Sequence, residues 1–252
     1  MISAEHLWKY SEEIQLSFST VKEKSQNEFI SVDQNVIEEK LLSDVFHKIK
    51  NGLGGIGGFA TLLDRDIEAD DPRKRFVNRI QDTVILMNEF VVNLMTLTRM
   101  LEVKPNKVRL PLLVKDICRN YWGENEDGTE KNPITIDFPN DMEDIQADNR
   151  QMNEMVYHAI HFIKSIEGIC ESIQIVSHTE NTIILKFHFL LESDIEIDFQ
   201  NMADIMQNLE SVETRLSIGI VQKMARLHQG DISIVSDSES NYVLKVQIRK
   251  GL

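Results

Sequence analysis

The stretch FHKIKNGLGGIGGFATLL, Phe46 to Leu63, contains five of the chain's eleven glycines, all between Gly52 and Gly58 and shortly after a histidine. Glycine in a helix interior costs about 1 kcal/mol relative to alanine, so a helix here needs a compensating reason. A phosphate-binding loop is disfavoured, because the stretch lacks the Lys-Ser/Thr ending of a P-loop and follows no predicted strand. We therefore predict a helix whose surface below His47 is free of side chains.

Apolar residues recur around this stretch with the four-and-three spacing of a helix that packs against other helices. The first series is Leu42, Phe46, Ile49, Leu53 and Ile56. The second, after the acidic turn DRDIEADDP, is Ile80, Val84, Met87, Val91, Leu94, Thr98 and Leu101. Together they predict a helical hairpin over residues 34–104. Because a two-helix hairpin has little interior, we expect a homodimer that closes into a four-helix bundle.

His47 lies beside the first apolar series rather than within it. Asn51 is one helical turn further on the same edge, and Gly54 and Gly58 continue that edge. A histidine on a helix is ordinarily a solvated surface residue, and this alternative stays open at this point.

FHKIKNGLGGIGGFATLL resembles the phosphoacceptor motif of bacterial two-component sensor histidine kinases, especially the nitrogen-regulatory type with its pattern His-Glu-Ile-Lys-Asn-Pro-Leu-Gly-Gly-Ile. The resemblance implies that His47 carries a phosphoryl group and that Asn51 orients water when a partner is dephosphorylated. Lys48 replaces the acidic residue that helps accept the histidine proton, and Gly52 replaces proline. Because a cation offers no base, Lys48 disfavours autophosphorylation from ATP.

Beyond Pro105 the pattern changes to short helices and alternating strands. Expected elements are a strand in KVRL, a helix over 112–122, a strand in ITIDF, a helix over 150–166, two strands within IQIVSHTENTIILKFHFLL, a helix over 212–228 and a final hairpin. The predicted fold class is α+β: a helical hairpin forming a dimeric four-helix bundle, then an α/β sandwich over 105–252 with a mostly antiparallel sheet. The sandwich resembles the histidine kinase ATPase domain. Residues 1–33 are predicted to be an N-terminal helical extension.

The nucleotide-contact motifs of that ATPase domain are replaced. His158 and Phe162 stand at the two asparagine positions of the helix that holds magnesium in the family. The adenine-binding segment is matched by ESDIEIDFQN, where Asp194 has no accompanying glycine. Arg215 and Ser217 stand at glycine positions where backbone amides approach phosphates, and their side chains obstruct that approach. We expect a degenerate domain that keeps its fold without binding ATP.

Other chemistry finds little support. His158 and His161 have the spacing of two metal ligands on a helix, but no third ligand is evident, so we predict no metal and no cofactor in this chain. Cys118 and Cys170 form no CxxC pair and are expected to be buried apolar residues. The net charge of −14 argues against nucleic-acid binding. No apolar run approaches the roughly 20 residues that cross a bilayer, so we expect no membrane insertion and a cytoplasmic protein.

The favoured hypothesis is a histidine phosphotransferase or pseudokinase of a two-component phosphorelay. His47 would exchange phosphoryl with the aspartate of a response regulator receiver domain, whose own magnesium assists, or Asn51 and water would dephosphorylate the receiver. Glycines such as Gly54 would permit close docking, and Lys48 and Lys50 would attract the receiver's acidic pocket. Two alternatives remain: a non-catalytic dimeric scaffold that inhibits a response regulator or kinase, and a divergent active ATP-dependent histidine kinase. The receiver, the direction of phosphoryl flow and the input signal are not identified by the sequence.

Overall fold

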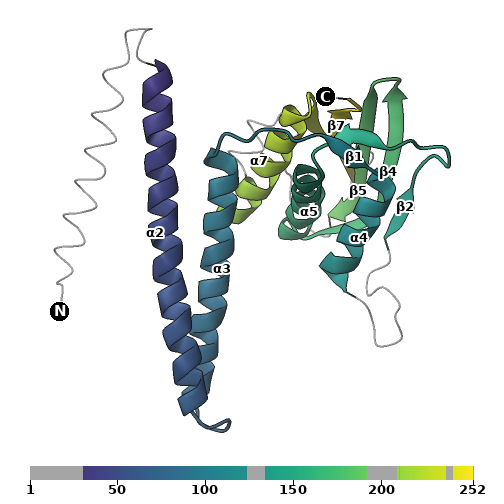
Figure 1. Ribbon diagram of the computed structural model, residues 1–252. Coiled ribbons are helices and arrows are strands. Elements are labelled where there is room, and N and C mark those ends of the chain that lie inside the picture. The colour runs from purple at the N-terminus through teal and green to yellow at the C-terminus, as the bar shows by residue number, and fades with distance from the viewer. Residues whose placement is uncertain (1–30, 124–133, 192–208, 210, 237–240, 252) are drawn as a thin grey trace. The chain divides into compact units, whose positions relative to one another are not determined.

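Two long helices begin the part of the chain that the computed structural model describes, which comprises residues 31–123, 134–191, 209, 211–236 and 241–251 (Figure 1). Helix α2 spans Ser31–Asp66 and helix α3 spans Lys74–Thr98. Residues up to Val45 form one unit and residues 46–252 form another. The described residues of the first unit are the N-terminal part of α2. The predicted division into residues 1–33, 34–104 and 105–252 stays a prediction.

The turn between α2 and α3 is held by its own acidic residue. Asp71 forms an ion pair with Arg73 at 2.6 Å, and the backbone N–H of Arg73 donates to the same carboxylate at 2.7 Å. These hydrogen bonds from Arg73 lower the pKa of Asp71 to about 2. The acidic turn expected from the sequence therefore has a defined geometry.

The interior of the helical hairpin in the second unit is small. One cluster joins Phe46 of α2 to Val91 and Met95 of α3, and Leu53 and Leu94 pack against it. Ala60 of α2 and Val77 of α3 are also buried. Many other apolar side chains of both helices are exposed. A hairpin with so small a core gains little from burial. The four-helix bundle expected from the sequence stays a prediction.

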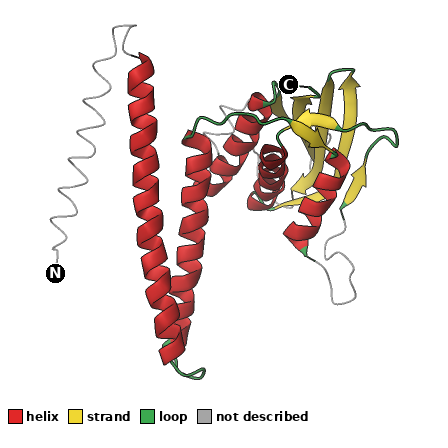
Figure 2. Ribbon diagram, viewed as in Figure 1, coloured by secondary structure: helices red, strands yellow, loops and turns green. Residues whose placement is uncertain are grey.

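The remaining helices pack on one side of a five-stranded sheet (Figure 2). The helices are α4 (Leu110–Trp122), α5 (Asn149–Ser165) and α7 (Val212–Leu227). The sheet has the order β2-β4-β5-β7-β6, and its strands are β2 (Thr135–Asp137), β4 (Gly168–Thr179), β5 (Thr182–Leu191), β6 (Asp231–Ser236) and β7 (Asn241–Arg249). A separate antiparallel pair joins β1 (Asn106–Val108) to β3 (Ile145–Ala147). The predicted α+β class is confirmed.

A single apolar core lies between these helices and the sheet. In β5, every second side chain is buried, including Ile183, Leu185, Phe187 and Phe189. This alternation is the one expected of a strand with one face against helices. The helices contribute buried side chains at helical spacing, such as Met152, Met155, Val156, Ala159, Ile160 and Ile163 of α5.

Several details differ from the sequence-based expectation. Helix α4 begins at Leu110 rather than at residue 112, because Pro111 fits the first helical turn, where its missing N–H is not needed. The short strand β3 was not predicted. The sheet is antiparallel as expected except between β2 and β4, which are parallel. No helix in the described ranges is long and apolar enough to cross a bilayer.

Candidate functional site

His47 is an exposed residue of α2, which continues without a break through the glycine-rich stretch. All five glycines from Gly52 to Gly58 are helical, so this stretch is not a loop. Asn51, Gly54 and Gly58 are exposed as well. At roughly 100° per residue these three positions lie within about 40° of His47 around the helix axis. The predicted edge is therefore continuous and open to solvent.

The five glycines have different surroundings. A Cβ added at Gly57 would lie 3.3 Å from Cγ1 of Val84 in α3, so Gly57 lets the two helices approach closely. A Cβ added at Gly52, Gly54, Gly55 or Gly58 would have no atom of the described residues within 4 Å. Packing among the described residues thus accounts for only one of the five, which the sequence pattern did not distinguish.

Two lysines lie on either side of the histidine edge. Lys48 and Lys50 are both exposed, and they lie roughly 100° and 60° from His47 around the helix, on opposite sides of it. A phosphoryl group on the imidazole would therefore have a cationic side chain within reach on each flank. This arrangement can offset phosphate charge.

Three residues that the family resemblance aligns with nucleotide contacts are buried. Phe162 is completely buried, His158 is 3% exposed, and Ser217 is 1% exposed. His158 Nε2 lies 3.6 Å from a carboxylate oxygen of Glu154 on the same helix. Its Nδ1 is buried and makes no hydrogen bond to the described residues. The side chains at the two asparagine positions thus fill the interior rather than line an open cavity.

A histidine and a serine connect α5 to α7. Nδ1 of His161 lies 3.1 Å from Oγ of Ser217, and that hydroxyl also donates to the backbone oxygen of Glu213 at 3.1 Å. Since the serine proton is used toward Glu213, Nδ1 of His161 is the donor in the first bond. Burial lowers the pKa of His161 below 6.5. Ser217 was predicted only to obstruct phosphates, and the hydrogen bond to His161 was not predicted.

The sequence also singled out Arg215, Asp194, a pair of histidines with the spacing of metal ligands, and the two cysteines. Arg215 of α7 is half-buried, whereas Asp194 lies outside the described residues. Within the described ranges, no group of three or more histidine, cysteine or acidic side chains could hold a metal ion. Cys118 and Cys170 are buried, as predicted, and form no disulfide. Burial raises the pKa of the Cys170 thiol to about 12.

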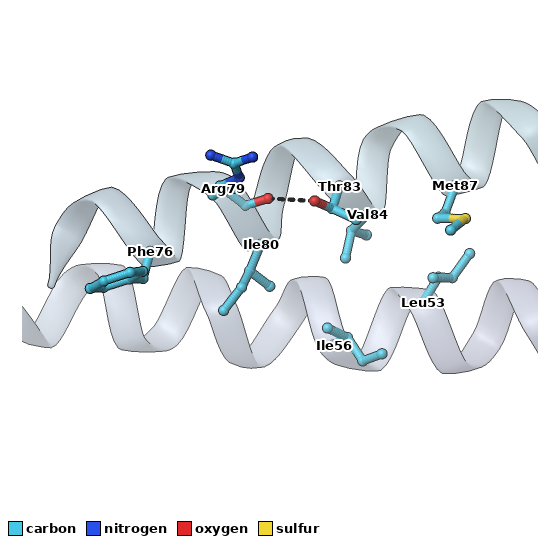
Figure 3. A pocket seen from close by; sticks show the side chains of 8 residues that line it. All are labelled: Leu53, Ile56, Phe76, Arg79, Ile80, Thr83, Val84 and Met87. Carbon is cyan, nitrogen blue, oxygen red and sulfur yellow. Dashed lines mark hydrogen bonds between the residues drawn. The ribbon is translucent and has the colours of Figure 1, made fainter. Parts of the chain in front are cut away.

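An apolar groove of about 500 Å³ runs between α2 and α3 (Figure 3). It is lined by Leu53, Ile56, Phe76, Arg79, Ile80, Thr83, Val84 and Met87. Ile80 and Met87 of α3 point toward α2, and Leu53 points toward Met87. Several of these positions belong to the two apolar series of the sequence. The groove shows that the series are only partly covered within one chain.

The architecture is shared with a solved histidine kinase structure. No protein-family model matches the chain. The sensor protein kinase PilS of Pseudomonas aeruginosa is 31% identical over 84 residues, which are 33% of this chain and 16% of PilS. The structure of full-length ShkA in complex with AMPPNP aligns with 83% of this chain and 45% of the ShkA chain, at a TM-score of 0.66 and 12% identity. The Acinetobacter baumannii histidine kinase AdeS aligns with 81% of this chain and 95% of its own, at a TM-score of 0.48 and 13% identity.

The fold is therefore histidine-kinase-like: two long helices are followed by an α/β domain that resembles the histidine kinase ATPase domain. The chain matches less than half of the length of ShkA and of PilS.

Proposed function

We propose that this protein is a histidine phosphotransferase or pseudokinase of a two-component phosphorelay. The observation that carries the proposal is the exposed edge of α2, where His47 and Asn51 are followed by Gly54 and Gly58 with open space around them. A globular partner can approach such an edge at backbone distance, which side chains at the glycine positions would prevent. The partner is a response regulator receiver domain carrying an aspartyl phosphate.

The transfer step is a nucleophilic substitution at phosphorus. An unprotonated imidazole nitrogen of His47 attacks the phosphorus atom, a nitrogen–phosphorus bond forms, and the bond to the receiver's aspartate oxygen breaks. The aspartate leaves as a carboxylate. In the reverse reaction the aspartate oxygen of the receiver attacks the phosphorus atom, and the nitrogen–phosphorus bond to His47 breaks. Magnesium bound by the receiver supplies charge neutralisation, and this chain needs no cofactor of its own.

Dephosphorylation uses water in place of the imidazole. The amide of Asn51, one helical turn from His47, is placed to orient a water molecule toward the phosphorus atom of the docked receiver. The products are inorganic phosphate and the receiver's free aspartate. Lys48 and Lys50 favour docking because their charges complement the acidic pocket of a receiver domain.

The α/β domain supports an ATP-independent function. Phe162 and Ser217 are buried. Nδ1 of His161 donates a hydrogen bond to Oγ of Ser217, and this bond connects α5 to α7. A triphosphate and its magnesium would have to displace these packed side chains. We infer that the domain serves as a docking surface that helps to select the receiver.

The groove between α2 and α3 supports a homodimer. Its lining is mainly apolar, and Ile56, Phe76 and Met87 are at least half exposed in one chain. A second copy that covers the groove would complete a four-helix bundle and bury those side chains. We place this dimer in the cytoplasm, with neither nucleic acid nor membrane among its partners.

The test is a reaction with receiver domains of the same organism, each phosphorylated with acetyl phosphate and freed of excess donor. Wild-type protein should shorten the lifetime of the aspartyl phosphate on its receiver and acquire acid-labile phosphate, whereas His47→Ala should not acquire it. If His47→Ala shortens the lifetime of the aspartyl phosphate as much as wild type does on every receiver, the phosphotransfer hypothesis is contradicted. Binding of a receiver without any change in its phosphate lifetime would favour the scaffold.

A further inference from the structure

The end of α3 is capped by a lysine that comes from α7. Nζ of Lys223 lies 2.8 Å from the backbone oxygen of Thr96, 2.7 Å from that of Leu97 and 2.5 Å from that of Arg99. The last carbonyls of a helix have no partner within the helix, and an ammonium group has three hydrogens to donate. One side chain distant in sequence thus satisfies three carbonyls where α3 ends.

The segment after α3 is held by residues at the start of α5. Nε2 of Gln151 donates to the backbone oxygen of Glu102 at 2.8 Å, and the backbone N–H of Lys104 donates to Oδ2 of Asp148 at 2.9 Å. Gln151 is 1% exposed and Asp148 is 7% exposed. Breaking either bond would leave a buried polar side chain with fewer partners, which is costly.

Asp148 links this segment to both α5 and α7. Its Oδ1 accepts the backbone N–H groups of Arg150 and Gln151 and so caps α5. Its own N–H donates to Nε2 of His228, the C-cap residue of α7. The segment, the beginning of α5 and the end of α7 are therefore parts of one hydrogen-bond network.

Apolar packing reinforces these bonds. The side chains of Leu97 and Leu101 pack against the core of the α/β domain. The end of α3 and the segment that follows it are thus held by two leucines, by hydrogen bonds that Lys223 and Gln151 donate, and by the bond that Asp148 accepts. A connection of this length without such contacts would be free to act as a hinge.

We propose that residues 97–104, together with Lys223, Gln151 and Asp148, form a clasp that fixes the α/β domain to the end of α3. Lys223 is the residue whose withdrawal opens the clasp, because it makes three of the bonds and its stem is only half-buried. Opening converts the fixed connection into a hinge and frees the domain. The clasp is a conformational device independent of the chemistry proposed for His47.

Amide hydrogen exchange in the full-length protein tests the clasp. In wild type, the amides of residues 101–104 should exchange slowly, since Lys104 donates to the buried Asp148. Lys223→Met, which keeps an apolar stem, should speed their exchange about tenfold or more. Amides of β5 serve as the reference and should keep their wild-type rates. The matched control is Lys107→Met, because Lys107 is an exposed lysine of β1 outside the clasp.

Equal exchange at residues 101–104 in wild type and Lys223→Met would overturn the clasp, as would an equal increase in Lys107→Met. If β5 also loses protection in Lys223→Met, the same measurement is made on Lys223→Gln, which keeps a hydrogen-bond donor on a shorter side chain. That variant should raise exchange at residues 101–104 while β5 stays protected. Wild-type rates at residues 101–104 in Lys223→Gln, or exchange that rises equally in β5, would then reject the proposal.

Discussion

At the scale of single residues, His47 and Asn51 have separate tasks in the proposed chemistry. His47 forms the bond to phosphorus, whereas Asn51 acts only on water. Asn51→Ala should therefore slow dephosphorylation of the receiver roughly 100-fold, the usual loss when one positioned hydrogen-bonding group is removed, and leave phosphoryl transfer to His47 within about twofold. Rapid-quench measurement of both reactions on one receiver checks this. A parallel loss of both reactions would contradict the separate tasks.

His228 should make the stability of the protein depend on pH. The residue is completely buried; its Nδ1 donates to the backbone oxygen of Met224 and its Nε2 accepts from Asp148. Burial lowers its pKa below 6.5 in the folded protein. As pH falls below 6.5 the unfolded chain therefore binds more protons than the folded one, and the stability present above pH 6.5 is progressively lost.

We expect the midpoint of urea unfolding to fall between pH 7.5 and pH 5.5, and to fall less in His228→Gln, whose amide can accept from Asp148 and donate to Met224. Asp148 does not titrate in this pH range. Burial raises the pKa of its carboxyl, but hydrogen bonds from Lys104, Gln151 and Arg150 together outweigh burial and hold that pKa below 3.8. Parallel pH profiles for wild type and His228→Gln would show that another group is responsible.

At the scale of elements, the glycines of α2 should be a compromise between helix stability and docking. Gly54→Ala and Gly58→Ala should each stabilise the helix by about 1 kcal/mol, because the added methyl group meets open space. The same substitutions should raise the KM for the phosphorylated receiver several-fold by blocking its approach beside His47. Thermal unfolding and transfer kinetics measure the two effects.

Gly52→Ala is the matched control. It also meets open space, but it lies roughly 140° around the helix from His47. It should gain the same stability with unchanged transfer kinetics. If Gly54→Ala and Gly58→Ala transfer as fast as Gly52→Ala, the glycines do not serve receiver docking.

The groove between α2 and α3 makes a second prediction at this scale. Ile80→Glu should convert the homodimer to a monomer, because the charge would be buried against the second copy. Ile85→Glu should leave the dimer intact, since Ile85 is also exposed but lies outside the groove, roughly 140° away around α3. Sedimentation equilibrium distinguishes the variants. A wild-type monomer, or dissociation by both substitutions, would contradict the proposed interface.

The same scale shows why some elements are predictable from sequence and others are not. The helical hairpin and β5 are recognisable because their apolar residues recur at the spacing of a helix and of a strand. β3 is too short for its pattern to stand out, and it exists through its pairing with β1. Gly57 resembles its four neighbours in sequence, and only the position of Val84 distinguishes it.

At the scale of the whole molecule, the sequence predicts which residues are of interest, but many of the contacts between them form only in the tertiary structure. The exposed edge with His47 and Asn51 follows from helical spacing. His161 and Ser217, which share a hydrogen bond, are 56 positions apart, and Lys223 is up to 127 positions from the carbonyls that it contacts at the end of α3. No local sequence pattern predicts such contacts. A cap at Asp148 was detectable in principle, since Asp followed by Gln three positions later is typical of a helix start.

The central claim is that His47 receives phosphoryl from a receiver domain and not from ATP. The most direct test offers the same protein two radiolabelled donors in parallel, a phosphorylated receiver and magnesium ATP, and measures acid-labile label on wild type and on His47→Ala. We predict label on wild-type His47 from the receiver, at least tenfold less from ATP, and none on His47→Ala from either donor. Robust labelling of His47 by ATP would contradict the claim and identify a divergent histidine kinase instead.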